Sequence, residues 1–259
     1  MGILNVTPDS FSDGGSFVSK GEMIKHVRQM ISAGADIIDV GGESSRPFAN
    51  PVSLEEELNR VLPAIETIRS EYSIPISIDT TKADVARLAV EAGADIINDI
   101  SALRFDPEMA SVVKYSGCPL VVMHMQGTPG DMQVAPTYSD IVTESIDFFK
   151  ERISWLAVKG IPKNLLILDP GIGFGKTLQH NLTILNHLDA YRSLGCPLLV
   201  GHSRKSFIGK ILADETADRE IGTAAISSFL VYQHTAIIRV HDVAKNMQAI
   251  KAAQAIMAA

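Results

Sequence analysis

Positive charge is scarce in this chain of 259 residues. Its 23 lysines and arginines stand against 30 aspartates and glutamates, which gives a formal net charge of −7. A general nucleic-acid binder needs a basic face that replaces the counterions of the phosphates, so we expect no nucleic-acid partner. A few local basic side chains could still bind a small anion, and anionic substrates therefore stay open.

Cysteine is scarcer still, with only Cys118 and Cys196. Each stands in a Gly-Cys-Pro-Leu segment, which favours a small buried side chain over a disulfide or a metal ligand. No apolar run reaches the roughly 18 residues that a membrane span requires, and Asn5 and Asp9 interrupt the first apolar run. We therefore expect a cytoplasmic protein with no membrane segment and no signal peptide.

Several common catalytic motifs are missing. The chain has no zinc-type spacing of His, Cys and acidic residues, and no Gly-x-Ser-x-Gly nucleophile elbow. The segment PGIGFGKT (170–177) is close to a phosphate-binding P-loop, but Pro170 stands where that motif begins with glycine. Lys176 replaces the third glycine of a dinucleotide fingerprint. We interpret the segment as a tight loop that approaches its neighbours closely.

Short apolar runs, in contrast, are abundant. They are rich in Val, Ile and Leu without strict alternation, as in parallel strands that are buried on both faces. Between them lie segments with helical spacing, one of which begins at Ser53 with Glu56 as a capping-box partner. The apolar runs are residues 2–6, 36–42, 75–80, 95–100, 119–124, 165–171, 197–203 and 236–242.

Repeated joints between these elements favour one architecture. AGADIIDV (33–40) returns as AGADIIND (92–99), and GCPL occurs at 117–120 and at 195–198. Each joint combines the end of a helix with the start of the next strand. Strand–helix units repeated over about 250 residues predict an α/β fold, a single-domain (β/α)8 TIM barrel over residues 1–259. An open, doubly wound sheet is the alternative.

Polar residues stand at the carboxyl ends of all eight predicted strands. Any one of them could be a helix cap or a turn residue, but capping does not explain the whole set. In a (β/α)8 barrel these ends converge on one mouth, where active sites lie. The residues are Asn5, Asp39, Asp79, Asn98, Asp99, His124, Asp169, His202, Ser203, Arg239 and His241.

The cations among these residues favour an anionic ligand. Arg239 and His241 are two residues apart and so share one face of the last strand. Arg46 follows the second strand, and the segment GHSRKS (201–206) brings Ser203 and Lys205 to an expected helix start, which suits a carboxylate or a phosphate.

The acceptors at the same mouth suit a ring with N–H groups. Asp79, Asn98 and Asp169 can each accept hydrogen bonds from such an edge. The sequence shows no covalent nucleophile and no redox motif. We therefore expect a transfer reaction in which an anionic group leaves and the enzyme supplies positioning and electrostatic stabilisation.

Eight segments in a fixed order carry a family resemblance. They are MGILNVTPDSFSDGG, GGESSRP, SIDT, IINDIS, MHMQGTP, DPGIGFGKT, GHSRKSFIG and RVHDV. Together they resemble the dihydropteroate synthases of bacterial folate synthesis. The resemblance implies a (β/α)8 barrel that joins 6-hydroxymethyl-7,8-dihydropterin pyrophosphate to 4-aminobenzoate, giving 7,8-dihydropteroate and pyrophosphate. It also implies Mg²⁺ as the cofactor.

The same resemblance implies roles for individual residues. The pterin would be held by Asp79, Asn98, Asp169, Lys205 and Arg239. The pyrophosphate would be bound by Asn5, Ser45, Arg46, Arg239 and His241, with Mg²⁺ on the side-chain oxygen of Asn5. The 4-aminobenzoate would contact Phe11, Pro47, Phe174 and Ser203. The residues that would take part in catalysis are Asp13, Arg46, Lys205, Arg239 and His241.

The family's mechanism is dissociative, so pyrophosphate would leave before the amine of 4-aminobenzoate attacks the cationic carbon. Asp13 could stabilise that cation, and we expect residues 7–15 to form a mobile lid that is weakly ordered without ligands. Family members usually have Thr where this chain has Ser45, which keeps the hydroxyl. They usually also carry a segment before the position of Met1, so we expect either a missing segment or an open barrel floor.

Other interpretations stay open at this point. A pterin-dependent methyltransferase would share the acceptors but would not need the anion site. A catalytically silent paralogue would bind pterin alone, and a sugar-phosphate isomerase would need a clear general base, since fold alone does not give function. The resemblance also implies a homodimer through the last helices, where the apolar face of residues 221–231 could equally be core packing.

Overall fold

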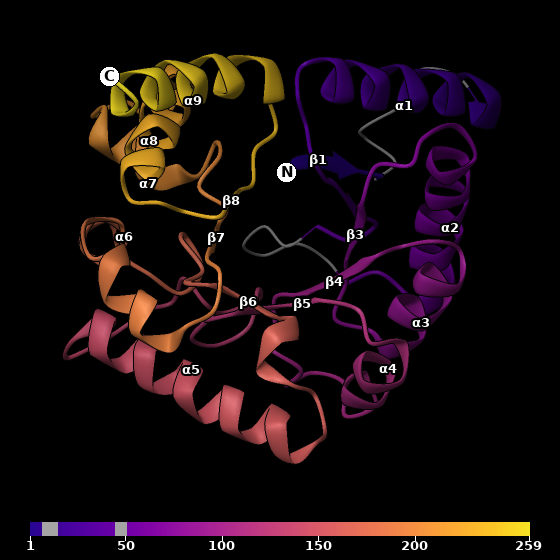
Figure 1. Cartoon of the computed structure of the whole chain (residues 1–259), viewed down its shortest axis with the longest axis horizontal. Helices are drawn as coiled ribbons and strands as arrows, with labels where there is room; N and C mark the ends of the chain where they lie inside the picture. Colours follow the sequence, from indigo (N-terminus) through magenta and orange to yellow (C-terminus); the bar gives the residue numbers. More distant parts are fainter. Residues whose placement is uncertain (7–14, 45–50) are drawn as a thin grey trace.

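The parallel strands of the described chain follow one another around a ring (Figure 1). The structure, a computed structural model, describes residues 1–6, 15–44 and 51–259, without the side chains of residues 15–20. Strands β1 to β6 form one sheet in sequence order, and β7 pairs with β8. The strands are β1 (Gly2–Asn5), β2 (Ile38–Gly41), β3 (Ile76–Asp79), β4 (Ile96–Asp99), β5 (Leu120–Met123), β6 (Leu166–Asp169), β7 (Leu199–Val200) and β8 (Ile237–Ile238).

Two backbone bridges close these two sheets into a barrel. Leu168 bridges to Leu198 at the joint of β6 and β7. At the other joint, Ile3 N–H donates to Val240 O and Val240 N–H donates to Met1 O, both at 3.0 Å. The predicted (β/α)8 barrel is therefore confirmed, and the open sheet is wrong.

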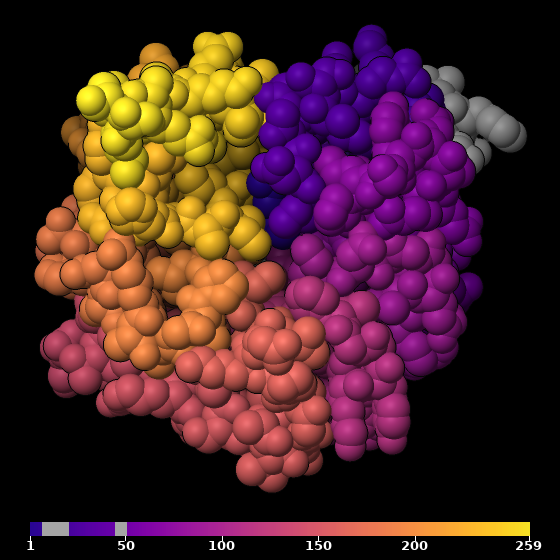
Figure 2. All heavy atoms as spheres, viewed as in Figure 1, coloured from indigo at the N-terminus to yellow at the C-terminus, as the bar shows by residue number. Residues whose placement is uncertain are grey.

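Helices surround the barrel on its outer side (Figure 1). They are α1 (Gly15–Ser32), α2 (Leu54–Glu71), α3 (Ala83–Glu91), α4 (Met109–Ser116), α5 (Ile141–Val158), α6 (Leu178–Asn186), α7 (Ser206–Ile211), α8 (Glu220–Tyr232) and α9 (Val243–Met257), with the short 3₁₀ segments η2 (Lys163–Leu165) and η3 (Leu188–Leu194). The two ends of the chain lie side by side, α1 in indigo next to α9 in yellow (Figure 2).

The predicted start of α2 is confirmed in part. Ser53 Oγ accepts the backbone N–H of Glu56 at 3.2 Å, as expected of an N-cap. The Glu56 side chain, however, does not complete a capping box, because it pairs with Arg60 one turn further along the helix. An exposed carboxylate gains as much from a neighbouring guanidinium as from a backbone N–H.

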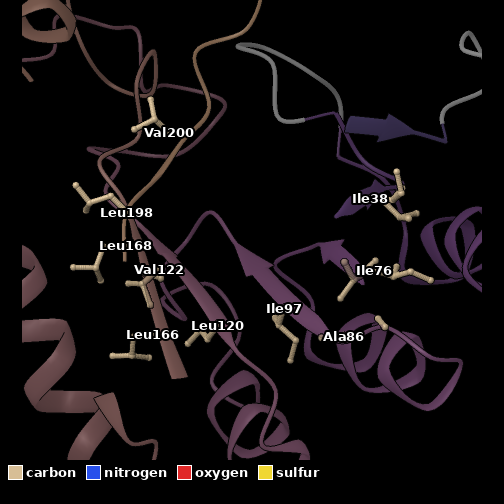
Figure 3. Close-up of a cluster of buried hydrophobic side chains, with 14 of the residues drawn as sticks. Ile38, Ile76, Ala86, Ile97, Leu120, Val122, Leu166, Leu168, Leu198 and Val200 are labelled. Carbon is tan, nitrogen blue, oxygen red and sulfur yellow. The ribbon is translucent and has the colours of Figure 1, made fainter. Parts of the chain in front are cut away.

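Two apolar layers stabilise the barrel. The outward side chains of the strands pack against the helices, as the close-up of Ile38, Ile97, Leu120 and Val200 illustrates (Figure 3). The inward layer consists of Ile96, Val121, Ile167 and Leu199, with Met1, Ile37 and Ile237 packed against them. Alternation along each strand separates the two layers, and it also decides which polar residues point into the barrel.

The expected burial of the two cysteines is confirmed only in part. Cys118 and Cys196 are free thiols that are partly buried against the main core. Within residues 1–6, 15–44 and 51–259, no helix combines the length and the hydropathy that a membrane crossing requires.

Candidate active site

Along four strands, an inward-facing apolar side chain is followed two residues later by an inward-facing polar one. Ile37, Ile96, Ile167 and Ile237 belong to the inward layer. Since side chains alternate along a strand, the residues two positions later also point inward. These are Asp39, Asn98, Asp169 and Arg239, and they lie directly above the apolar floor at the carboxyl ends of the strands.

Arg239 joins two carboxylates from different strands. Its Nε donates to Asp39 Oδ2 at 2.6 Å, and its Nη2 donates to Asp79 Oδ2 at 2.6 Å. Asp39 is fully buried and also accepts a hydrogen bond from Asn98 Nδ2 at 3.3 Å. This network ties β2, β3 and β4 to the residue that follows β8, and it fixes the Arg239 guanidinium in the mouth.

The acceptors expected to hold a ring are poorly solvated. Burial raises the pKa of Asp79 to about 7; Arg239 opposes this rise and Asp39 adds to it. Burial also raises the pKa of Asp169, against the opposing effects of Lys205 and of the Gly171 N–H, which donates to Asp169 Oδ1 at 2.7 Å. The Asp79 carboxyl can therefore exchange a proton with a ligand near neutral pH.

Lys205 lies on the opposite side of the mouth, against the loop that follows β6. Its Nζ donates to Ile172 O and lies 4.2 Å from the centre of the Phe174 ring. Gly173 makes this contact possible, because a Cβ there would come within 2.7 Å of Lys205 Cδ. Burial lowers the pKa of Lys205 to about 7, and Asp169 opposes that shift.

Ser203 holds His241 at the rim. Its Oγ accepts the backbone N–H of His241 at 3.2 Å and lies 3.0 Å from His241 Nδ1. Asn5 ends β1 nearby, since a Cβ built on Gly41 would lie 3.9 Å from Asn5 Oδ1 and 3.6 Å from Asp79 Cβ. An amide, a histidine and an arginine thus share one side of the mouth, which suits an anionic group.

Comparison with known proteins identifies the family. The family described as pterin binding enzyme matches residues 1–241. A dihydropteroate synthase of Synechocystis sp. is 48% identical over 257 residues, covering 99% of this chain and 89% of that protein. The Escherichia coli K12 dihydropteroate synthase is 47% identical and covers 100% of this chain and 92% of its own length.

The chain belongs to the dihydropteroate synthase family. Solved structures of the family share its fold. The Yersinia pestis dihydropteroate synthase with a sulfonamide drug complex has a TM-score of 0.93 at 44% identity, covering 100% of this chain and 94% of that one. The Xanthomonas albilineans dihydropteroate synthase in complex with 7,8-dihydropteroate has a TM-score of 0.89 at 40% identity, covering 100% and 93%.

The described part of the chain brings most of the proposed family site together. Asn5, Asp79, Asn98, Asp169, Phe174, Ser203, Lys205, Arg239 and His241 all lie at the carboxyl ends of the strands or in the loops that follow them. Phe11, Asp13, Ser45, Arg46 and Pro47 lie outside the described residues, as do residues 7–14 of the lid expected over residues 7–15, whereas Gly15 begins α1. Their roles, and the predicted order of that loop, stay predictions.

Magnesium would find one protein ligand among the described residues. Within that part of the chain, no group of three or more His, Cys, Asp or Glu residues could hold a metal ion. Mg²⁺ commonly takes only one or two protein oxygens and completes its shell with phosphates and water. The Asn5 side-chain oxygen at the mouth fits this arrangement.

Three residues predicted at the mouth point the other way. The His124 ring packs 5.1 Å from the Phe148 ring of α5, and burial lowers its pKa to about 2. His202 Nε2 lies 2.9 Å from Thr223 O of α8. Asp99 accepts backbone N–H groups in the turn after β4. Each directly follows an inward-facing position, so alternation turns it towards the helices.

Two residues of the site were not assigned a role from the sequence. Asp39 is one of the polar residues at the predicted strand ends. Its position two residues after Ile37 is the sequence feature that indicates an inward side chain. Lys176 appears in the sequence only as the residue of PGIGFGKT that replaces the third glycine of a dinucleotide fingerprint. It is only 3% exposed, and its Nζ donates to His124 O at 3.1 Å and to Phe174 O at 2.9 Å. No sequence spacing indicates that contact.

Proposed function

We propose that this chain joins 6-hydroxymethyl-7,8-dihydropterin pyrophosphate to 4-aminobenzoate, forming 7,8-dihydropteroate and pyrophosphate. The observation that carries the proposal is the mouth itself, where buried acceptors for a ring lie beside Arg239 and His241 in a chain of this family. Among its structural relatives, Xanthomonas albilineans dihydropteroate synthase is known with 4-aminobenzoic acid and with 7,8-dihydropteroate.

The pterin is bound by groups that match its hydrogen-bonding edge. Asp79, Asn98 and Asp169 accept from the ring amino and N–H groups, and Lys205 donates to the ring carbonyl. When the ring takes the place of Arg239 on Asp79, the guanidinium keeps Asp39 as its partner. Arg239 therefore stays charged and in position, and its plane is available to lie against the ring.

The pyrophosphate is bound on the side of Asn5 and His241. Arg239 reaches it from the barrel, and Ser45 and Arg46 are proposed as its further ligands. Asn5 would hold Mg²⁺, which would supply positive charge to the leaving phosphates. His241 is held by Ser203 through two contacts, at 3.2 Å and 3.0 Å, so it meets the leaving group without reorganisation.

The reaction proceeds by a dissociative path. Pyrophosphate leaves with the electron pair of its C–O bond, and the exocyclic carbon becomes cationic. The amine of 4-aminobenzoate attacks this carbon and loses a proton. Asp13 stabilises the cation, Phe174 with Phe11 and Pro47 packs on the benzoate ring, and Ser203 meets its carboxylate.

A pyrophosphate-release assay tests the proposal. We expect release that requires Mg²⁺ and both substrates for full turnover, and Arg239→Ala should lower the rate by about a hundredfold or more, as expected for the loss of a preorganised charge. Arg192→Ala changes an exposed arginine outside the mouth and is the matched control. No release under any condition would exclude the enzyme, and pterin binding without release would indicate a silent paralogue.

Two variants test the mechanism and the metal site. Asp13→Asn should lower the turnover number much more than the affinity for pterin, because it acts on the developing cation. Asn5→Ala should raise the Mg²⁺ concentration needed for half-maximal rate, whereas Asn186→Ala on the exposed face of α6 should not. An unchanged turnover number for Asp13→Asn would contradict the dissociative role.

The protein forms a homodimer through α8. Ile221 is 84% exposed, and Phe229 and Tyr232 are also exposed on this helix. Beside it, α6, α7 and α8 line a groove of about 520 Å³. Exposed apolar patches of this kind mark subunit contacts. Ile221→Asp should give a monomer in sedimentation experiments, whereas Ile256→Asp on α9, 67% exposed in the native chain, should not.

The proposed compartment is the cytoplasm. Both cysteines are free thiols, and the described strands and helices need no disulfide. Free, partly exposed thiols are usual in a reducing compartment.

A further inference from the structure

The loop that follows β6 is fitted closely against the chain that leaves β5. A Cβ on Gly171 would come within 2.0 Å of His124 O, and one on Gly175 within 2.6 Å of Gln126 O. Both glycines have positive φ, 67° and 59°, which favours glycine. The loop carries Phe174 and connects directly to Asp169, so its position sets the geometry of one wall of the site.

Lys176 holds this loop from inside. Its ammonium group donates to His124 O at the exit of β5 and to Phe174 O on its own loop. Both acceptors are neutral carbonyls, and within the described chain Lys176 forms no ion pair with a carboxylate. A buried ammonium without a carboxylate partner is unfavourable, which argues for a role of the charge itself.

The charge of Lys176 acts on the substrate-binding groups. Burial lowers its pKa to about 7, and Asp169 is the group that opposes this shift while Lys205 adds to it. Lys176 in turn helps to lower the pKa of Asp169 against the effect of burial. The histidines that it influences, His124 and His180, have lowered pKa values, so Asp169 and Lys205 are its charged neighbours near neutral pH.

We propose that Lys176 is a positioning residue of the pterin site, which fixes the loop beneath Phe174 and keeps Asp169 ionised as an acceptor for the pterin ring. This inference rests on the proposed function, because Asp169 is taken as a pterin ligand. Lys205 sits where it can turn to the ring carbonyl, and Lys176 then remains as the buried cation beside Asp169. The two lysines that act on Asp169 then have separate roles: Lys205 contacts the ring, and Lys176 stays in the interior.

Binding of 6-hydroxymethylpterin, measured by calorimetry between about pH 5 and pH 9, tests the proposal. Lys176→Met removes the charge and keeps the stem, so the pKa of Asp169 should rise. The acid limb of the affinity profile should then shift upward by about one pH unit, which lowers the affinity by up to about tenfold on the acid side of the wild-type limb. Lys176→Arg stays charged and should keep the acid limb at or below its wild-type position.

Tyr138→Phe is the matched control. The Tyr138 hydroxyl donates to Gly175 O at 3.0 Å, so this variant loosens the same loop without changing a charge. It should leave the acid limb where it is in the wild type. A Lys176→Met profile that overlays the wild type, or an equal shift in Tyr138→Phe, would overturn the proposal.

The outcomes stay distinct if one variant fails to fold. Should Lys176→Met not accumulate, the proposal depends on Lys176→Arg, and an upward shift of its acid limb would refute it. Failure of the proposed function would appear differently, as a wild-type chain that neither binds the pterin nor releases pyrophosphate from the substrate.

Discussion

Replacement of Arg239 by Met should destabilise the protein in a pH-dependent way. The native guanidinium Nη2 lies 2.6 Å from an oxygen of Asp39 and 2.6 Å from an oxygen of Asp79. Methionine keeps most of the apolar stem and removes the charge. The two carboxyls then face each other in the barrel interior without a counter-ion, which is among the most unfavourable arrangements for buried acidic groups.

The size of the effect follows from the ion pair between Arg239 and Asp79. Opposite charges about 4 Å apart attract by about 4 kcal/mol at an effective dielectric constant of about 20. In the native protein Arg239 opposes the burial that raises the pKa of Asp79 to about 7. Loss of the guanidinium raises this pKa further, by about 1.5 units if half of the attraction is lost to screening, since one unit corresponds to about 1.4 kcal/mol.

The sign of the pH dependence is fixed by the direction of that shift. A carboxyl with a raised pKa in the folded state keeps a proton that the unfolded chain has lost, so stability falls as the pH rises towards the folded-state pKa. In the wild type, the loss of stability that comes from Asp79 is complete near pH 7. In Arg239→Met the loss continues above pH 7, and its deficit should grow by about 2 kcal/mol between about pH 6 and pH 9.

Urea unfolding at several pH values checks this expectation. The free energy of unfolding is compared between wild type and Arg239→Met, with the double variant Arg239→Met/Asp79→Asn as control. The amide cannot ionise, so most of the pH-dependent part should disappear in the double variant. A deficit that is constant from about pH 6 to pH 9 would refute the account of Arg239 as the counter-ion of Asp79.

Two other substitutions test the loops around the mouth. Gly171→Ala should lower the free energy of unfolding by about 2–4 kcal/mol, because the new Cβ meets His124 O at 2.0 Å. The control is Gly117→Ala, which has a similar φ of 68° and open space around it, and it should lower the free energy of unfolding by only about 1 kcal/mol. Equal losses for the two variants in thermal unfolding would contradict the close fit of Gly171. Asp99→Ala removes the acceptors of the Ser101 and Leu103 N–H groups, at 2.7 Å and 2.9 Å. It should lower the free energy of unfolding by about 2 kcal/mol and leave the pterin affinity unchanged. A selective loss of pterin binding would place Asp99 at the site after all.

The architecture, and the place of many polar residues at the strand ends, follow from the amino-acid sequence alone. Val-, Ile- and Leu-rich runs at regular spacing are typical of parallel strands covered by helices, and the barrel was confirmed. The position of Asn98, Asp169 and Arg239 at strand ends could also be predicted. In a closed parallel barrel all carboxyl ends meet at one mouth, so the position of a residue in its strand fixes its place in the molecule.

Which strand-end residues face each other depends on the closed barrel. Asp99, His124 and His202 belong to the same strand ends, yet alternation turns them outward, and their register was known only once the inward layer was seen. The pairing of Arg239 with Asp39 spans 200 residues of sequence. Contacts between residues so far apart in sequence depend on how the barrel closes, and local sequence patterns do not predict that closure.

Lys176 shows the same limit most clearly. Its neighbours in sequence suggest a phosphate-binding loop, whereas its ammonium group lies in the interior and donates to the carbonyl of His124, 52 residues away. Local sequence determined that this loop is tight, through glycines that permit positive φ. The fold decided what the loop packs against, because both the burial of Lys176 and its acceptor at His124 come from the neighbouring strand.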